Sequence, residues 1–207
     1  MANYLTEQEQ VELLKGFIKQ YSMMIVLGIL FAGLAIFLWR TYQERENRLD
    51  NHASLIFDEM LSAKTEHDTN AMQFNADKLE KHYTKTVYRS FAALLLANDA
   101  IARKNYLEAE KQLNWVIYKS HTVPLKQIAR LRLARVYIAN QHPEKALQLL
   151  NKTDDSHFEG LIDEVKGDAY LSLHQSSVAK AWYQKALETL PEAANLHPLL
   201  QMKYDNL

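Results

Sequence analysis

This sequence predicts an all-α protein in which a single transmembrane helix precedes a solenoid of stacked antiparallel helix pairs. Three observations predict this fold class: an uncharged apolar segment near the N-terminus, pairs of small residues that recur along the rest of the chain, and few glycines and prolines. Five glycines and four prolines in 207 residues are too few for a β domain with many tight turns. Helices joined by short turns are therefore expected to make up most of the chain.

The apolar segment covers residues 20–39, which carry no charge and lie between Lys19 and Arg40. At about 1.5 Å of rise per residue, a helix of this length reaches about 30 Å, the hydrocarbon thickness of a bilayer. A core helix would carry a polar stripe, and a signal peptide would end at a small-residue cleavage site; this segment has neither. We therefore predict an uncleaved membrane anchor.

Aromatic rings at both ends support the predicted anchor. Tyr21 and Trp39 stand where amphipathic rings favour the headgroup region of a bilayer. The resulting division of the chain is an N-terminal tail (1–20), a transmembrane helix (21–39), a polar juxtamembrane stalk (40–50) and a helical-repeat domain (51–207).

Three small residues, Gly28, Ala32 and Ala35, fall on one face of the transmembrane helix. Small residues at this spacing let a second membrane helix approach closely, so this face is a candidate membrane-helix contact. The alternative is that these residues simply face lipid.

The composition excludes several function classes. Residues 40–207 carry 22 basic and 22 acidic residues, a balance that gives no electrostatic footprint for nucleic acid. The chain has no cysteine, so neither a disulfide nor a cysteine-based metal site can form. None of the eight histidines pairs with another at helical spacing, and no phosphate-binding loop or nucleophile elbow is present. We expect no enzyme activity, no cofactor, no metal and no small-molecule substrate.

The repeats appear as two small residues twelve positions apart, in three segments offset by 37 and 33 residues. The pairs are Ala97 with Ala109, Ala134 with Ala146, and Gly167 with Ala179. Small residues let two antiparallel helices cross closely, and this spacing is typical of tetratricopeptide repeats, whose helix pairs stack into a superhelix with a concave face. The alternative is three ordinary helical hairpins with small residues at their crossings by chance.

The turns and ends of the domain follow from the same phasing. Turns are predicted at Lys104–Asn105, Gln141–Pro143 and His174–Ser176, between the paired helices. Residues 51–86 are interpreted as a degenerate first pair. A final helix around Leu200 is expected to cover the exposed edge of the last repeat.

Four motifs identify a resemblance over essentially the whole chain. They are EQVELLKGFIKQY (residues 9–21), LRLARVYI (131–138), EVKGDAYLS (164–172) and LLQMKYDNL (199–207). On these motifs the chain resembles the YfgM family, ancillary subunits of the bacterial SecYEG translocon; the resemblance is weakest between residues 51 and 86. It implies a bacterial inner-membrane protein with a cytoplasmic N-terminus and a periplasmic tetratricopeptide-like domain. It also implies partnership with the SecYEG translocon and the membrane-anchored periplasmic chaperone PpiD. Secretory proteins are expected as further clients of such a partner.

Charge alone favours the opposite orientation. Two lysines precede the anchor and three arginines follow it closely, whereas basic residues are normally enriched on the cytoplasmic side. A large following domain is translocated largely regardless of flanking charge. The expected orientation therefore comes from the resemblance.

In a superhelix of this kind, the first helix of each pair lines the concave face. The predicted partner-binding groove comprises Phe91, Asn98, Ile101, Ile128, Arg135, Ile138, Leu161, Glu164, Asp168 and Leu171. An apolar groove with a few polar residues can hold an extended or helical protein segment. The alternative is that Leu94, Leu131 and Leu161 are plain core residues and that Arg135 pairs with Asp168 across adjacent repeats.

We therefore expect a membrane-anchored, non-enzymatic interaction protein of the translocon. Its concave face would assist the hand-over of secreted proteins to periplasmic chaperones. The alternative function is that of a structural scaffold in envelope assembly or cell division, unrelated to secretion.

Overall fold

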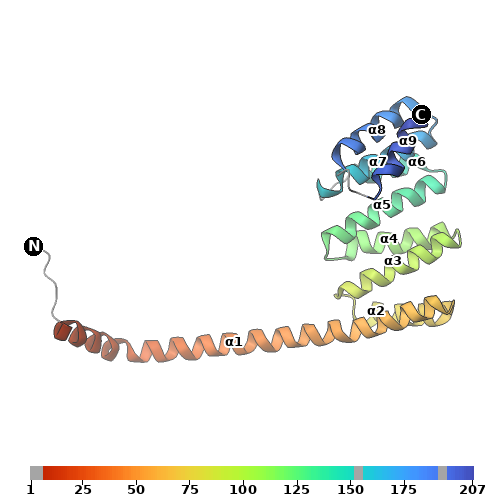
Figure 1. The fold of residues 1–207 in the computed structure, drawn as a ribbon. Coiled ribbons are helices and arrows are strands. Elements are labelled where there is room, and N and C mark those ends of the chain that lie inside the picture. Colours follow the sequence, from red (N-terminus) through yellow and green to blue (C-terminus); the bar gives the residue numbers. More distant parts are fainter. Residues whose placement is uncertain (1–6, 152–155, 191–194) are drawn as a thin grey trace, which may run out of the picture. The chain divides into compact units, whose positions relative to one another are not determined.

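The structure is a computed structural model that describes residues 7–151, 156–190 and 195–207. Within these residues every regular element is a helix, as the predicted all-α fold class requires. The helices are α1 (Glu7–Thr65), α2 (Thr69–His82), α3 (Val87–Ala102), α4 (Tyr106–Lys119), α5 (Val123–Ala139), α6 (Pro143–Leu150), the 3₁₀-helix η1 (Ser156–Phe158), α7 (Glu159–Ser172), α8 (Ser176–Thr189) and α9 (His197–Asp205). The chain forms two compact units, Met1–Leu49 and Asp50–Leu207 (Figure 1).

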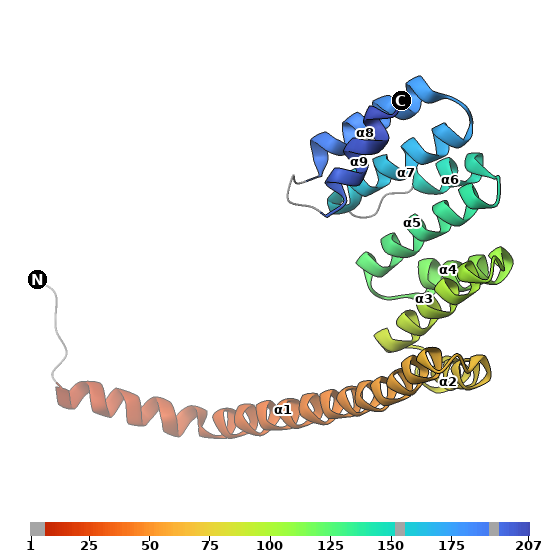
Figure 2. The ribbon, with the colours of Figure 1, turned by 45° about the vertical axis from the view of Figure 1, so that its right-hand side comes forward.

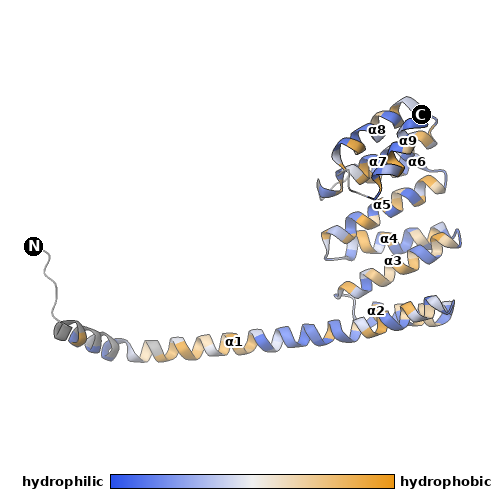
Figure 3. Ribbon diagram, viewed as in Figure 1, coloured by the Kyte–Doolittle hydropathy of each residue, from blue (hydrophilic) through white to orange (hydrophobic). Residues whose placement is uncertain are grey.

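The first unit consists of most of α1. Within the described residues, α1 is the one helix that is long and apolar enough to cross a membrane. Its apolar side chains are exposed along the span, for example Phe31 at 75% and Trp39 at 67%. Figure 3 shows this apolar band followed by a hydrophilic stretch. Apolar surface on all sides of a helix is expected where the solvent is lipid.

The stalk between the anchor and the repeats is helical. α1 continues without a break from Glu7 to Thr65, so segments that the sequence analysis treated separately form one helix. Residues 41–50 contain no glycine or proline and are rich in Glu, Gln and Arg, which favour helix. Tyr42 also donates a hydrogen bond of 2.7 Å to Glu46 one turn later.

The second unit is a stack of antiparallel helix pairs (Figures 1 and 2). The last part of α1, residues 50–65, pairs with α2; α3 pairs with α4, α5 with α6, and α7 with α8, and α9 follows. Four buried clusters run through the stack, each containing residues of neighbouring helices. The core is therefore built between successive elements, as in helical-repeat proteins.

The turn inside each pair has one shared conformation. His67, Lys104, Gln141 and His174 all have φ between 58° and 61°, the left-handed region. Each turn is closed by the same two backbone hydrogen bonds; in the third pair, Gln141 N donates to Ile138 O and His142 N to Tyr137 O. This is the Schellman motif that ends many helices. The three predicted turns are confirmed.

The fourth such turn, at His67, belongs to the first pair. Met60 and Met72 stand 37 residues before Ala97 and Ala109, at the equivalent crossing positions, and are 0% and 2% exposed. Residues 51–86 therefore contain a helix pair of the same kind. It looks degenerate in sequence because methionine, a flexible side chain that fits irregular gaps, replaces alanine at the crossing.

Candidate protein-binding surface

The ten residues of the predicted groove lie on the first helices of three successive pairs, α3, α5 and α7. Asn98, Arg135 and Leu171 are exposed; Phe91, Ile101, Ile128, Ile138, Leu161 and Asp168 are partly buried; Glu164 is buried. The structure therefore leaves nine of the ten at least partly accessible.

Two residues of the alternative interpretation are core residues. Leu94 is 7% exposed and Leu131 is 4% exposed, and each belongs to a buried cluster. Leu161 is partly buried and packs against the second of these clusters. The first two were correctly expected to be core, and Leu161 is intermediate between core and surface.

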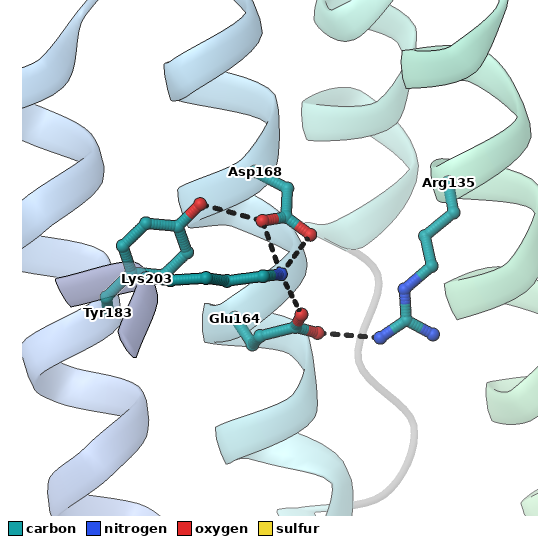
Figure 4. A network of polar contacts seen from close by, with 5 residues as sticks. All are labelled: Arg135, Glu164, Asp168, Tyr183 and Lys203. Atoms are coloured by element: carbon teal, nitrogen blue, oxygen red, sulfur yellow. Dashed lines mark hydrogen bonds and ion pairs between the residues drawn. The ribbon is translucent and has the colours of Figure 1, made fainter. Parts of the chain in front are cut away.

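Glu164 occupies the repeat position that holds Leu131 in the preceding pair, 33 residues earlier. Although it is 2% exposed, its carboxylate is fully paired. Oε2 accepts from Arg135 Nη2 at 2.6 Å, and Oε1 accepts from Lys203 Nζ at 2.5 Å (Figure 4). A carboxylate replaces a core leucine here because two cations from neighbouring helices compensate its desolvation.

Arg135 was expected to pair with Asp168 in the alternative interpretation, and that partner is wrong. Arg135 pairs with Glu164, whereas Asp168 accepts hydrogen bonds from Lys203 Nζ at 2.7 and 2.9 Å and from the Tyr183 hydroxyl at 2.7 Å. The physical reason is competition: Lys203 and Tyr183 already bind the Asp168 carboxylate.

The two carboxyl groups of this network respond oppositely to their surroundings. Burial tends to raise the pKa of Glu164, but the hydrogen bond from Lys203 and the charges of Arg135 and Lys203 hold it below the ordinary value. Burial raises the pKa of Asp168 in spite of the hydrogen bond from Lys203, and the charge of Glu164 adds to the rise. Burial would lower the pKa of Lys203, but its bonds to both carboxylates raise it.

Sequence reasoning missed Lys203 and Tyr183 as members of this network. Lys203 belongs to α9, which was expected only as a covering helix; Leu200 and Tyr204 do pack in the last buried cluster, as a covering helix requires. Lys203 is 39 residues from Glu164, and α9 has no paired helix to set its phase. No spacing in the sequence therefore links Lys203 to its carboxylates.

A cavity of about 310 Å³ lies beside the groove, between α3, α4 and α5. Its lining consists of Ile101, Tyr106, Arg132, Arg135, Val136 and Ala139. Ile101 and Arg135 belong to both the cavity and the predicted groove. The lining is mostly apolar, with arginine side chains as its charged groups.

In residues 7–151, 156–190 and 195–207, no three His, Asp or Glu side chains are grouped so that they could hold a metal ion. The acidic groups of the groove are held in ion pairs by Arg135 and Lys203. The surface offers apolar contacts and fixed charges, which suit the recognition of another protein.

The fold and this surface define a helical-repeat protein with a membrane-anchor helix. The chain belongs to the family of the tetratricopeptide repeat-like domain, whose family model matches residues 15–207. It is similar over 100% of its length to curated proteins named ancillary SecYEG translocon subunit. It is 27% identical to that of Neisseria gonorrhoeae, 25% to that of Escherichia coli and 24% to that of Haemophilus influenzae, covering 100%, 99% and 100% of those proteins.

These comparisons confirm the family resemblance drawn from the sequence motifs. The matches span both the anchor and the repeats, and the relatives are named as translocon subunits rather than as enzymes. No solved structure is a significant match to the chain.

Proposed function

We propose that this protein is an ancillary subunit of the SecYEG translocon that binds other proteins through the predicted groove. One observation carries the proposal: the similarity to proteins of that name extends over the whole chain, so it includes both the anchor helix and the repeat domain. A relative that shared only the repeats would support protein binding but not a place at the translocon.

The proposed orientation has the N-terminus in the cytoplasm and residues 51–207 in the periplasm, with residues 21–39 crossing the inner membrane. In this orientation the repeat domain meets secreted proteins as they leave the translocon. It would assist their hand-over to periplasmic chaperones, with the membrane-anchored chaperone PpiD as a partner. The family resemblance supports this orientation, and the exposed apolar length of α1 supports a single span.

Photo-crosslinking in living cells tests the proposed partners. A photoreactive amino acid replaces Asn98, an exposed groove residue, or Leu107, which is 81% exposed on α4 outside the groove. We expect crosslinks to SecYEG subunits or PpiD from position 98 and none of these from position 107. Crosslinks to envelope-assembly or division proteins alone would instead support the scaffold function.

A reporter fusion tests the orientation independently. Alkaline phosphatase joined after Leu207 is active only outside the cytoplasm. We expect high activity, whereas activity only from a cytoplasmic reporter at the same position would refute a periplasmic repeat domain.

A further inference from the structure

We propose that the cavity between α3, α4 and α5 binds a bulky apolar side chain of a partner protein, and that a neighbouring acidic side chain of the partner pairs with Arg132 and Arg135. This inference rests on the proposed function, because it assumes that the groove binds proteins, and it specifies the chemistry of the bound segment.

The shape and lining of the cavity determine the apolar part of the partner. Its volume is about 310 Å³, at the lower end of the range of about 300–1,000 Å³ that is usual for ligand pockets. The lining includes Ile101, Tyr106, Val136 and Ala139, from three helices. A space of this size and character fits a large aliphatic or aromatic side chain.

The two arginines determine the charged part of the partner. Arg132 and Arg135 are three residues apart on α5, so their side chains lie on neighbouring positions of one helix face. Arg132 is exposed, and no ion pair joins it to any side chain in the described part of the protein. Arg135 uses one nitrogen for Glu164, and 45% of its side chain remains exposed. An incoming carboxylate can therefore contact both guanidinium groups.

The acidic residues of the groove do not offset this positive charge. Glu164 and Asp168 both accept from Lys203, and Glu164 also accepts from Arg135, so two carboxylates face two cations. Among the charged side chains of the groove and the cavity lining, Arg132 is the one without an ion-pair partner in the part of the chain that the structure describes. The sequence predicted a groove of mixed charge, but after internal pairing the structure leaves a surface complementary to an anion.

The position of the cavity favours an acidic side chain over a chain terminus. Ile101 and Arg135 belong to both the cavity and the groove, so a segment that lies along the groove passes over the cavity. Such a segment can place one apolar side chain in the cavity and its acidic neighbour on the arginines without ending there.

Peptide binding to the full chain in detergent micelles tests the proposal. The probes are fluorescent, end-capped peptides with a central Phe-Asp pair, compared with Phe-Lys, Ala-Asp and Ala-Lys versions in the same glycine-serine context. Anisotropy titrations should show tightest binding for Phe-Asp. We expect at least about fivefold weaker binding when either residue is replaced, because each replacement removes one of two independent contacts.

Two variants with matched controls locate the contacts. Arg132→Glu should weaken Phe-Asp binding by at least about tenfold and remove the preference for Asp over Lys. Its control is Lys85→Glu, the same charge change at an exposed residue. Lys85 lies just before the start of α3, whereas the cavity residue Ile101 lies at the end of α3. Ala139→Phe should fill the cavity and remove the preference for Phe over Ala. Its control is Ala102→Phe, at the equivalent exposed position, 37 residues earlier and outside the cavity lining.

Each result either supports or overturns the proposal, provided that circular dichroism shows all four variants folded. Equal binding of Phe-Asp and Phe-Lys, equal effects of a variant and its control, or no binding of any probe would each overturn it. Binding that requires a free C-terminal carboxylate on the peptide would assign the anion to a chain end and also overturn it. Crosslinking from position 98 is a separate readout, so failure of the cavity proposal and failure of the translocon proposal are distinguishable.

Discussion

Gly167 and Tyr183 are a pair of residues that must be considered together. In the preceding repeat the equivalent positions hold Ala134 and Leu150, both buried in one cluster. A Cβ added at Gly167 would lie 2.5 Å from Cδ1 of Tyr183, which is fully buried. The fourth pair, α7 with α8, therefore has glycine at its crossing because the facing side chain is a tyrosine ring.

A double-mutant cycle tests this pairing. Gly167→Ala should lower the free energy of unfolding by about 1–3 kcal/mol through overpacking, although alanine is the better helix former by about 1 kcal/mol. In a Tyr183→Leu background the same change should cost less or become stabilising, because the smaller side chain leaves room for the methyl group. Urea unfolding followed by tryptophan fluorescence measures both values. An equal cost in the two backgrounds would show that Tyr183 is not the cause.

Lys203 is the residue that stabilises the buried carboxylate network. Lys203→Met should lower the free energy of unfolding by about 2–3 kcal/mol, because it removes one of the two cations of Glu164, whose side chain is 3% exposed. Lys119→Met, at an exposed lysine on α4, is the control and should change it by less than about 0.5 kcal/mol. If the free energy of unfolding fell by less than about 0.5 kcal/mol in both variants, Arg135 alone would be enough to compensate the charge of Glu164.

The same network should give a characteristic pH dependence. The pKa of Glu164 is lowered in the fold, so its contribution to stability is present above pH 4.5, its ordinary pKa, and is lost as the pH falls through the lowered value. The difference in unfolding free energy between the unsubstituted protein and Glu164→Gln should therefore shrink below pH 4.5. Asp168→Asn provides a comparison of opposite sign, since the raised pKa of Asp168 favours its protonated form in the fold. Urea unfolding at a series of pH values above and below 4.5 measures both differences. If the two variants changed in the same direction with pH, the opposite pKa shifts of Glu164 and Asp168 would be contradicted.

At the scale of elements, the turn inside each pair is the unit that repeats most faithfully. Its left-handed residue is His67, Lys104, Gln141 or His174, none of which is glycine. An L-residue in this conformation costs about 1–2 kcal/mol, which the two closing hydrogen bonds and the packing of the pair offset. The phase of the stack is therefore set by helix length and packing rather than by glycine.

This strain predicts a stabilising substitution. Gln141→Gly should raise the free energy of unfolding by about 0.5–1 kcal/mol, because the relief of strain exceeds the conformational entropy that glycine loses on folding. Asn140→Gly is the control: with φ of −90° it is unstrained, so glycine should destabilise there. Thermal unfolding measures both. Destabilisation at both positions would show that residue 141 stores no strain.

The division into two units gives a prediction for the whole molecule. Residues 50–207 contain all four buried clusters, so this fragment should fold without the anchor. One of these clusters lies between the end of α1, α2 and α3. A fragment of residues 66–207 lacks its residues Ala53, Met60 and Ala63, so the facing Met72, Leu79 and Leu96 lose their cover. Its thermal midpoint should fall by about 5–10 °C relative to residues 50–207, as circular dichroism can measure. Equal midpoints would mean that α1 contributes nothing to the repeat domain.

The sequence by itself determined the anchor, the helix pairs and their turns. Each of these depends on residues close together in the chain: an uncharged run long enough for a bilayer, small residues twelve positions apart, and a recurring turn. It could not reveal that Met60 and Met72 form the first crossing. Methionine is not a small residue, so its fit at a crossing is recognised only once the space between the two helices is known.

Only the tertiary structure decided which charges of the groove are paired. Glu164 meets Arg135 29 residues away and Lys203 39 residues away, and the latter contact exists because α9 docks beside α7 and α8. Arg132, which lines the cavity, has no ion-pair partner among the residues that the structure describes. A repeat pattern fixes which helices pack, but the partner of a buried charge depends on where the last helix lies, which no local spacing encodes.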